Sequence, residues 1–189
     1  AGNIFVGLAL GDAAEDLFKK ALRTDPTYHD SYKELGSLYI KQGRFAAALP
    51  VLKQALSLQP NDAQSFFHLG LAYAGLEQYA SSLRAFKKAI ELNPTYVKAY
   101  YNLGTLLLKL ATYDEALEAL AHAVRLDPVY SDAWYNLAAT YARLHDKAHA
   151  LATLQQAIRL NPALRAEAKR DNDFTNLHED SDFLQLMHR

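Results

Sequence analysis

Histidines and a C-terminal group of acidic residues are the side chains of this sequence most able to carry chemistry. His145 and His149 lie four residues apart, a spacing with which two histidines bind zinc from one helix. They fall on either side of an expected turn, however, and no glutamate follows His145 as a zinc protease requires. We therefore interpret both histidines as solvated turn residues and predict no metal site.

The acidic segment DNDFTNLHEDSD, residues 171–182, loosely resembles a calcium-binding loop. Such a loop needs a glycine at its sharp turn and a bidentate glutamate at its end. Asn176 stands at the position of the glycine, and the glutamate is missing. The sequence also has no cysteine, no Gly-rich phosphate loop and no nucleophile elbow. We predict that this chain is not an enzyme and binds no cofactor.

The composition places few other limits on function. The chain has 189 residues with a net charge of -1, which lacks the strongly basic character of proteins that bind nucleic acid. No apolar run approaches the ~18 residues of a membrane span, and GNIFVGLALG lacks the basic flank of a signal peptide. These features favour the cytoplasm. Because Met187 is the only methionine, we expect Ala1 to begin within a longer protein.

A period of 34 residues organises most of the chain. Five prolines mark it: Pro26, Pro60, Pro94, Pro128 and Pro162. An aromatic residue follows each of the first four prolines by six positions, and a leucine and then a small residue come three and four positions later. The aromatic residues are Tyr32, Phe66, Tyr100 and Trp134, and the small residues are Gly36, Gly70, Gly104 and Ala138. An internal period of this length indicates stacked structural repeats.

Each period predicts two helices. Large apolar residues three or four positions apart place one apolar stripe on each helix, and the small residues let neighbouring helices approach closely. Proline ends the second helix, while Thr112 and Glu115 have the capping-box spacing that marks its start. One helical hairpin cannot bury its stripe alone, so we expect the hairpins to stack. Pro50 should bend or loosen the helix that contains it.

This pattern resembles the tetratricopeptide repeat (TPR), whose signature is W-x2-L-G-x2-Y, then A-x3-F, A and P. The resemblance implies an all-α fold, a right-handed superhelix of stacked antiparallel helical hairpins. Gly2, Phe5, Ala14 and Phe18 occupy repeat positions, so Ala1 should lie inside a first helix. The predicted parts are a partial repeat with a complete second helix (1–28), four repeats (29–62, 63–96, 97–130 and 131–162) and a C-terminal helical cap (163–189).

In this family the first helix of each repeat lines an inner groove. Counting from each glycine or alanine, we predict a groove with excess lysine and with an exposed ladder of Phe67, Tyr101 and Tyr135. Exposed aromatic residues in a row are typical of contact surfaces. The predicted groove residues are Lys33, Ser37, Phe67, His68, Leu71, Lys98, Tyr101, Asn102, Thr105, Lys109, Tyr135, Asn136 and Arg143.

Asn102 and Asn136 recur at the edge of this groove. A carboxamide both donates and accepts, so it can pair with an extended peptide backbone. In the similar repeats of the nucleocytoplasmic glycosyltransferase that adds N-acetylglucosamine, asparagines of this position hold peptides. The alternative is that each asparagine is solvated or bonded to the next repeat. Co-chaperones of this fold bind acidic C-termini through a carboxylate clamp, of which only Lys33 and Lys98 match.

We therefore predict a non-catalytic module that binds a peptide segment of a partner protein, with a preference for acidic segments. Two alternatives stay open: a substrate-recruiting arm of a larger enzyme, and a scaffold that associates with itself. The acidic tail, with Asp171, Asp173 and Phe174, also has two possible places. It either caps the last hairpin around Leu154 and Ile158, as terminal repeats require, or occupies a groove.

Overall fold

The computed structural model describes the backbone of residues 2–188 and the side-chain surroundings of residues 13–188, and it contains only helices and turns in that range. The chain divides into two compact units, with the boundary between Pro94 and Thr95. The first contains α1 (Gly2–Thr24), α2 (His29–Lys41), α3 (Phe45–Leu58), α4 (Ala63–Gly75) and α5 (Tyr79–Leu92). The second contains α6 (Val97–Lys109), α7 (Tyr113–Leu126), α8 (Ser131–Arg143), α9 (Lys147–Leu160), α10 (Leu164–Ala168), the 3₁₀ helix η1 (Asn172–Leu177) and α11 (Ser181–His188).

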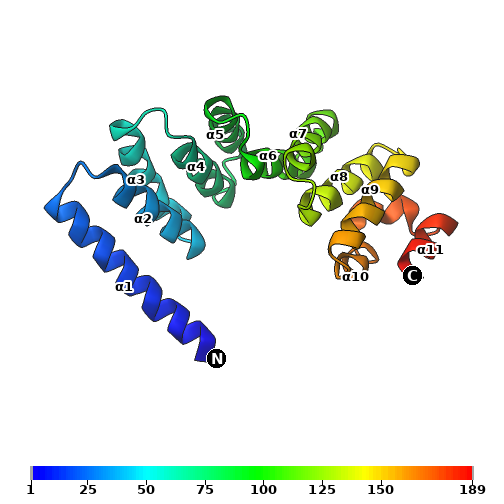
Figure 1. Ribbon diagram of the computed structural model, residues 1–189, viewed down its shortest axis with the longest axis horizontal. Helices are drawn as coiled ribbons and strands as arrows, with labels where there is room; N and C mark the ends of the chain where they lie inside the picture. Colours follow the sequence, from blue (N-terminus) through cyan, green and yellow to red (C-terminus); the bar gives the residue numbers. More distant parts are fainter. Residues whose placement is uncertain (1, 189) are drawn as a thin grey trace. The chain divides into compact units, whose positions relative to one another are not determined.

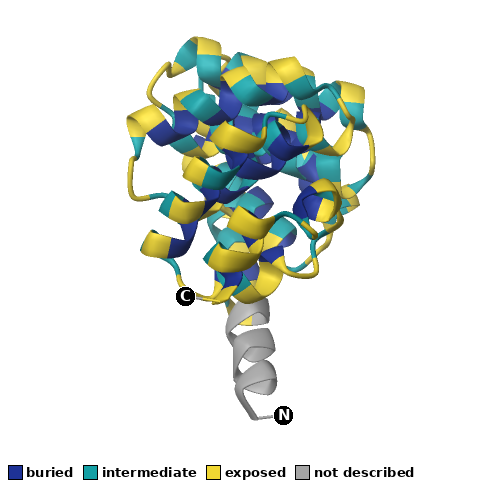
Figure 2. Cartoon of the chain, turned by 90° about the vertical axis from the view of Figure 1, so that its right-hand side faces the viewer, coloured by how far each residue is buried: buried dark blue, intermediate teal, exposed yellow. Residues whose placement is uncertain are grey.

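Antiparallel hairpins are the building blocks of both units (Figure 1). In the first unit, α2 pairs with α3 and α4 with α5, and α3 also packs on α4. In the second unit, α6 pairs with α7 and α8 with α9, while α7 packs on α8. Buried residues follow the faces where these helices meet, and exposed residues cover the outer faces (Figure 2). The predicted all-α fold of stacked antiparallel hairpins is confirmed.

Small residues allow the two helices of a hairpin to touch, as the sequence predicts. A Cβ atom added to Gly36 would lie 2.5 Å from Cδ2 of Leu52, and one added to Gly70 would lie 2.5 Å from Cε1 of Phe86. Leu52 and Phe86 are almost fully buried, at 0% and 1% exposure, so neither side chain has room to move. The glycines therefore set the distance between the paired helices.

The turn inside each hairpin contains one residue with a left-handed backbone conformation, and these residues recur every 34 positions. These residues are Gly43, Glu77, Ala111 and His145, with φ angles of 71°, 58°, 57° and 60°. The next residue donates its backbone N–H to the carbonyl of the residue five positions before it, at 2.8 Å from Arg44 to Tyr39 and 2.9 Å from Gln78 to Tyr73. This pattern is a Schellman motif, which satisfies the last carbonyl groups of the first helix.

Two local expectations concern Thr112 and Pro50, and the first differs from the structure. Thr112 precedes the first residue of α7 as predicted, but its side chain accepts no capping hydrogen bond. The left-handed residue just before it already fixes the entry into α7, so this helix starts without that bond. Pro50 lies within α3, whose 14 residues continue to Leu58. The helix is therefore continuous through the proline, and the expected bend stays a prediction.

The N-terminal segment is one helix over Gly2–Thr24, without the turn that would separate the two helices of a partial repeat. Gly2 and Phe5 belong to this helix, and their side chains lie outside the described part. Glu15 fastens α1 to the first hairpin: its carboxylate accepts a 2.9 Å hydrogen bond from the Tyr39 hydroxyl and pairs with Arg44. Lys19 of α1 joins the same carboxylate at 2.7 Å.

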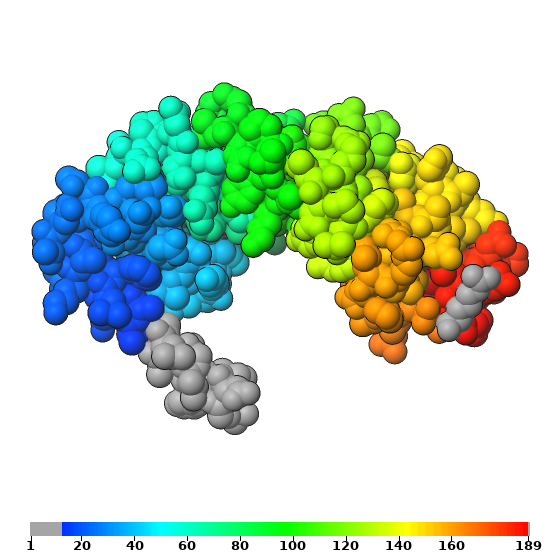
Figure 3. All heavy atoms as spheres, viewed as in Figure 1, coloured from blue at the N-terminus to red at the C-terminus, as the bar shows by residue number. Residues whose placement is uncertain are grey.

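The C-terminal segment keeps the spacing of the repeats, although its residues do not match the repeat pattern. α9 begins at Lys147, and α11 begins 34 residues later, at Ser181. α10 and η1 fill the place of a first helix, so the tail is a distorted hairpin. Phe174, Leu177, Phe183 and Met187 pack into the core that holds Leu154 and Ile158. The tail packs on α8 and α9 (Figure 3), and its role as a cap stays a prediction.

Candidate functional site

In the first unit, two of the five predicted groove residues are buried. Phe67 is 6% exposed, and its ring centroid lies 5.9 Å from that of Phe86 on α5, the other helix of its hairpin. His68 is buried beside Phe67, whereas Ser37 and Leu71 are half-buried. Lys33 donates a 2.8 Å hydrogen bond to Asp30 within α2. The prediction that Phe67 is an exposed contact residue is therefore wrong.

Tyr135 in the second unit is buried as well, at 5% exposure. Its hydroxyl donates a 2.7 Å hydrogen bond to Oδ2 of Asp171, and its ring meets Phe174 edge-on at 5.4 Å between centroids. Burial, with the Asp171 carboxylate beside it, raises the pKa of Tyr135 well above the ordinary value, so the hydroxyl keeps its proton. Only Tyr101, half-buried and 4.8 Å from the Tyr130 ring, remains of the exposed ladder.

The two repeated asparagines use an amide N–H inside the protein. Asn102 donates to the carbonyl of Lys98 at 2.8 Å within α6, near the exposed Lys98 side chain. Asn136 of α8 donates to Oγ1 of Thr105 on α6, also at 2.8 Å. For Asn136 the structure thus shows the bond to a neighbouring repeat. Each carboxamide also carries an acceptor oxygen, to which the N–H of a peptide backbone can donate.

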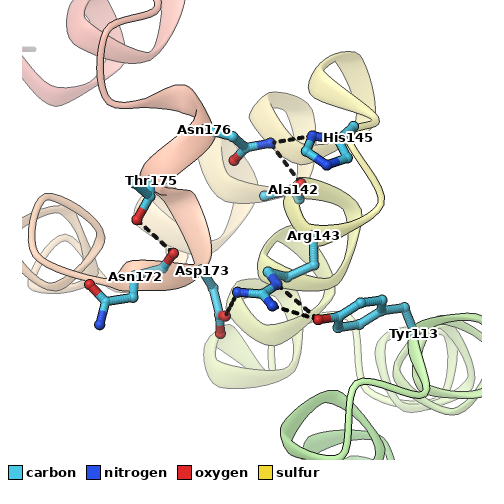
Figure 4. Close-up of a pocket in the computed structure, with 8 residues that line it drawn as sticks. All are labelled: Tyr113, Ala142, Arg143, His145, Asn172, Asp173, Thr175 and Asn176. Atoms are coloured by element: carbon cyan, nitrogen blue, oxygen red, sulfur yellow. Dashed lines mark hydrogen bonds and ion pairs between the residues drawn. The ribbon is translucent and has the colours of Figure 1, made fainter.

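Four predicted groove residues meet in one pocket of the second unit, with a volume of about 430 Å³. It is lined by Thr105, Leu108, Lys109, Ala111, Tyr113, Asn136, Arg143 and Asp173. α6 and α8 supply the predicted four, namely Thr105, Lys109, Asn136 and Arg143. A second pocket of about 390 Å³ lies between the end of α8 and η1, and both pockets share Tyr113, Arg143 and Asp173 (Figure 4).

Arg143 is the central cation of these pockets. Its Nε and Nη2 atoms donate to the Tyr113 hydroxyl at 3.0 and 2.7 Å, and its Nη1 lies 3.5 Å from Oδ1 of Asp173 (Figure 4). Partial burial and the nearby Asp171 carboxylate raise the pKa of Asp173, while Arg143 opposes that rise. The site therefore presents a guanidinium that is held in place and one carboxylate that is poorly stabilised as an anion.

Sequence reasoning missed Tyr113 and Asp173 as pocket residues. Tyr113 begins α7, a second helix, and only first helices were expected to line the groove. Asp173 comes from the tail, whose acidic character is visible in the sequence but whose place in the fold is not. Phe174 packs into the hydrophobic core, and Asp171 and Asp173 contact the predicted groove residues Tyr135 and Arg143.

The structure offers little support for other kinds of site. Among the described residues, no three histidine, aspartate or glutamate side chains come close enough together to hold a metal ion. His145 is near Asn176, and His149 bonds to Asp146, so the two histidines have different neighbours. In the same part of the chain, none of the helices has the length and apolar character needed to span a bilayer.

Stacked helical hairpins with a glycine-set spacing and a pocket between first helices define a helical repeat protein of the interaction type. Comparison with protein families gives matches to tetratricopeptide-repeat models at residues 33–97, 85–118 and 131–164. The chain therefore belongs to the tetratricopeptide-repeat family. No curated protein matches the sequence.

Solved structures with the same fold include MamA and YrrB. A MamA crystal structure shares 24% identity at a TM-score of 0.76, over 88% of this chain and 97% of that chain. A segment of MamA from Desulfovibrio magneticus RS-1 shares 26% identity at 0.68, over 85% of this chain and 93% of that chain. YrrB, described as a TPR protein with an unusual peptide-binding site, shares 29% identity at 0.69, over 87% of each chain.

Proposed function

We propose that this chain is a non-catalytic protein-interaction module that binds a peptide segment of a partner protein in the pocket of its second unit. The observation that carries the proposal is the meeting of Thr105, Lys109, Asn136 and Arg143 around one opening. The positions of these residues within the 34-residue repeat predict the same four. The likeness to YrrB, a TPR protein with a peptide-binding site, supports the same function.

The chemistry of the pocket suits an extended peptide. Asn136 offers its amide oxygen to the peptide backbone, while Leu108 and Ala111 give apolar surface for a side chain. Lys109 and Arg143 supply positive charge among the lining residues. Non-catalytic binding fits this arrangement, since no nucleophile with an adjacent general base is present among the pocket residues.

The experiment begins with peptides of twelve residues selected from a random display library on the immobilised full chain. The affinity of a selected peptide for the soluble chain is then measured by fluorescence anisotropy. Thr105→Val removes one pocket hydroxyl at constant size and should weaken binding by about three- to tenfold. Thr153→Val makes the same change on α9, where the hydroxyl bonds to its own helix, and should leave binding unchanged.

A second matched pair tests charge. Lys109→Gln changes the pocket rim, and Lys53→Gln changes an exposed position of α3 in the first unit. The proposal expects a loss of affinity for the first variant only. In each pair, the pocket variant and its control could instead change the peptide affinity equally, with circular dichroism unchanged. That result would place the binding surface elsewhere.

A further inference from the structure

The ion pair between Arg143 and Asp173 stands where the two pockets of the second unit adjoin. Both residues line both pockets, so this pair forms the partition between them (Figure 4). Arg143 belongs to α8 and Asp173 to η1, which places one side of the partition on a repeat and the other on the tail. Any group that takes the place of Asp173 at the guanidinium would join the two pockets.

The pair is a loose one. Nη1 and Oδ1 are 3.5 Å apart, whereas charge-assisted hydrogen bonds between nitrogen and oxygen are usually about 2.7–2.9 Å long. The Arg143 side chain is 43% exposed and that of Asp173 is 35% exposed, so water screens the attraction. The neighbouring Asp171 carboxylate repels Asp173 as well. Little holds these two side chains together.

The rest of η1 is fastened without this pair. Asp171 accepts the hydrogen bond of Tyr135, and Nδ2 of Asn176 donates to the carbonyl of Ala142 at 2.8 Å. Phe174 is fully buried. Asp173 can therefore leave Arg143 while the tail keeps its place as a cap. On the other side, two hydrogen bonds to Tyr113 keep the guanidinium aimed at the pocket.

We propose that Asp173 acts as an internal stand-in for a carboxylate of the partner, and that a peptide with an aspartate or glutamate binds by replacing it at Nη1 of Arg143. This inference rests on the proposed function of the pocket and names the chemistry of its partner, an acidic segment. In the absence of a partner, Asp173 fills the cation site. The tail thereby lowers the affinity for acidic peptides, and a peptide without a carboxylate at this position leaves Asp173 in its place.

The test uses the full chain and two versions of one peptide from the display selection: the peptide as selected, and the same peptide with each acidic residue changed to its amide. Asp173→Asn removes the competing charge at constant size. This variant should raise the affinity for the acidic peptide about threefold to fivefold, the range that the energy of an exposed ion pair allows. The amide peptide should bind Asp173→Asn and the parent equally. Arg143→Gln should abolish the preference for the acidic peptide.

Asp182→Asn is the matched control, because it makes the same charge change on α11, where Asp182 pairs with Lys147 outside the pockets. It should leave both peptides unaffected. Equal tightening by Asp173→Asn and Asp182→Asn would overturn the inference, since it would reflect overall charge. The inference would also be overturned if Asp173→Asn bound the acidic peptide with the same affinity as the parent or more weakly.

These outcomes separate the inference from the function on which it rests. Suppose that Thr105→Val weakens the binding of the selected peptides, that these contain no aspartate or glutamate, and that Asp173→Asn leaves their affinity unchanged. The inference then fails and the proposed function stands. If no selected peptide responds to Thr105→Val or Lys109→Gln, the proposed function fails. Asp173→Ser provides a second variant without the charge, and thermal unfolding of both variants shows whether the cap is intact.

Discussion

Tyr135 and Asp171, 36 residues apart in the chain, are joined by a 2.7 Å hydrogen bond from the tyrosine hydroxyl to the carboxylate. The bond connects the first helix of the last full repeat to the start of η1. This polar contact to Tyr135 is joined by an apolar one, because the buried Phe174 packs against the same tyrosine ring.

Removing the Tyr135 hydroxyl tests the polar contact. Tyr135→Phe keeps the ring on Phe174 but leaves the partly buried Asp171 without its donor. We expect the free energy of unfolding to fall by ~1–3 kcal/mol, the usual worth of a hydrogen bond to a charged group. Urea unfolding followed by circular dichroism measures the change. Tyr141→Phe is the control, because the structure describes no hydrogen bond of that hydroxyl. An equal loss in both variants would contradict the assignment.

Truncating Phe174 tests the apolar contact. The side chain is 0% exposed, and Phe174→Ala leaves a cavity in the core of the second unit. Such changes cost ~3–5 kcal/mol, so calorimetry should show a clear drop in melting temperature. Leu184→Ala, at a tail position with 42% exposure, should cost less than ~0.5 kcal/mol. A small loss for Phe174→Ala would mean that the tail is a linker and not a cap.

Glu15 gives the first unit a dependence on pH. Hydrogen bonds from Arg44 and then from Lys19 lower the pKa of Glu15 from 4.5 to about 2. Because the folded pKa is depressed, the stabilisation is complete above about 4.5 and is lost as the pH falls toward 2. Glu15→Gln should cost ~1–3 kcal/mol at pH 7.

The gap in stability between the parent and Glu15→Gln should therefore narrow across that acidic range. Urea titrations at several pH values measure it. Asp16→Asn changes the exposed neighbour on α1 and serves as the control. A gap that stays constant between pH 7 and pH 2 would show that the carboxylate is not held in its charged form.

Gly70 tests the spacing between α4 and α5. In an open helix, alanine is favoured over glycine by up to ~1 kcal/mol. Here the added Cβ would meet the buried Phe86 ring at 2.5 Å, so we expect Gly70→Ala to destabilise the chain by ~1–3 kcal/mol. Ala138 shows that a Cβ fits the same position of the last full repeat, where Leu154 faces it in place of phenylalanine. Stabilisation by Gly70→Ala would disprove the close contact.

The hairpins could be predicted because the 34-residue period combines local signals that all point to one structure. Apolar stripes, glycines and prolines act within a single repeat, and no distant residue overrides them. The surface was less predictable. Phe67 and Tyr135 occupy positions that face the groove in related repeats, yet Phe86 buries the first and the tail buries the second.

The pocket could be predicted only in part for the same reason. Thr105 and Asn136 follow from repeat positions, because each belongs to a first helix. Tyr113 and Asp173 enter the pocket through packing between segments that are 30 or more residues apart in the chain, as in the contact of Tyr113 with Arg143. Nothing in the local composition of the tail tells whether Asp173 points to solvent or to a cation.

Because the left-handed turn recurs, the two helices of each hairpin are connected in the same way. Gly43, Glu77, Ala111 and His145 close their hairpins with the same backbone bonds, although only the first is the glycine that this conformation favours. Gene duplication or deletion in steps of 34 codons would therefore need no new type of turn between the helices of a hairpin. Only the hairpin that carries Tyr135 has to stay last, because the tail is fitted to it.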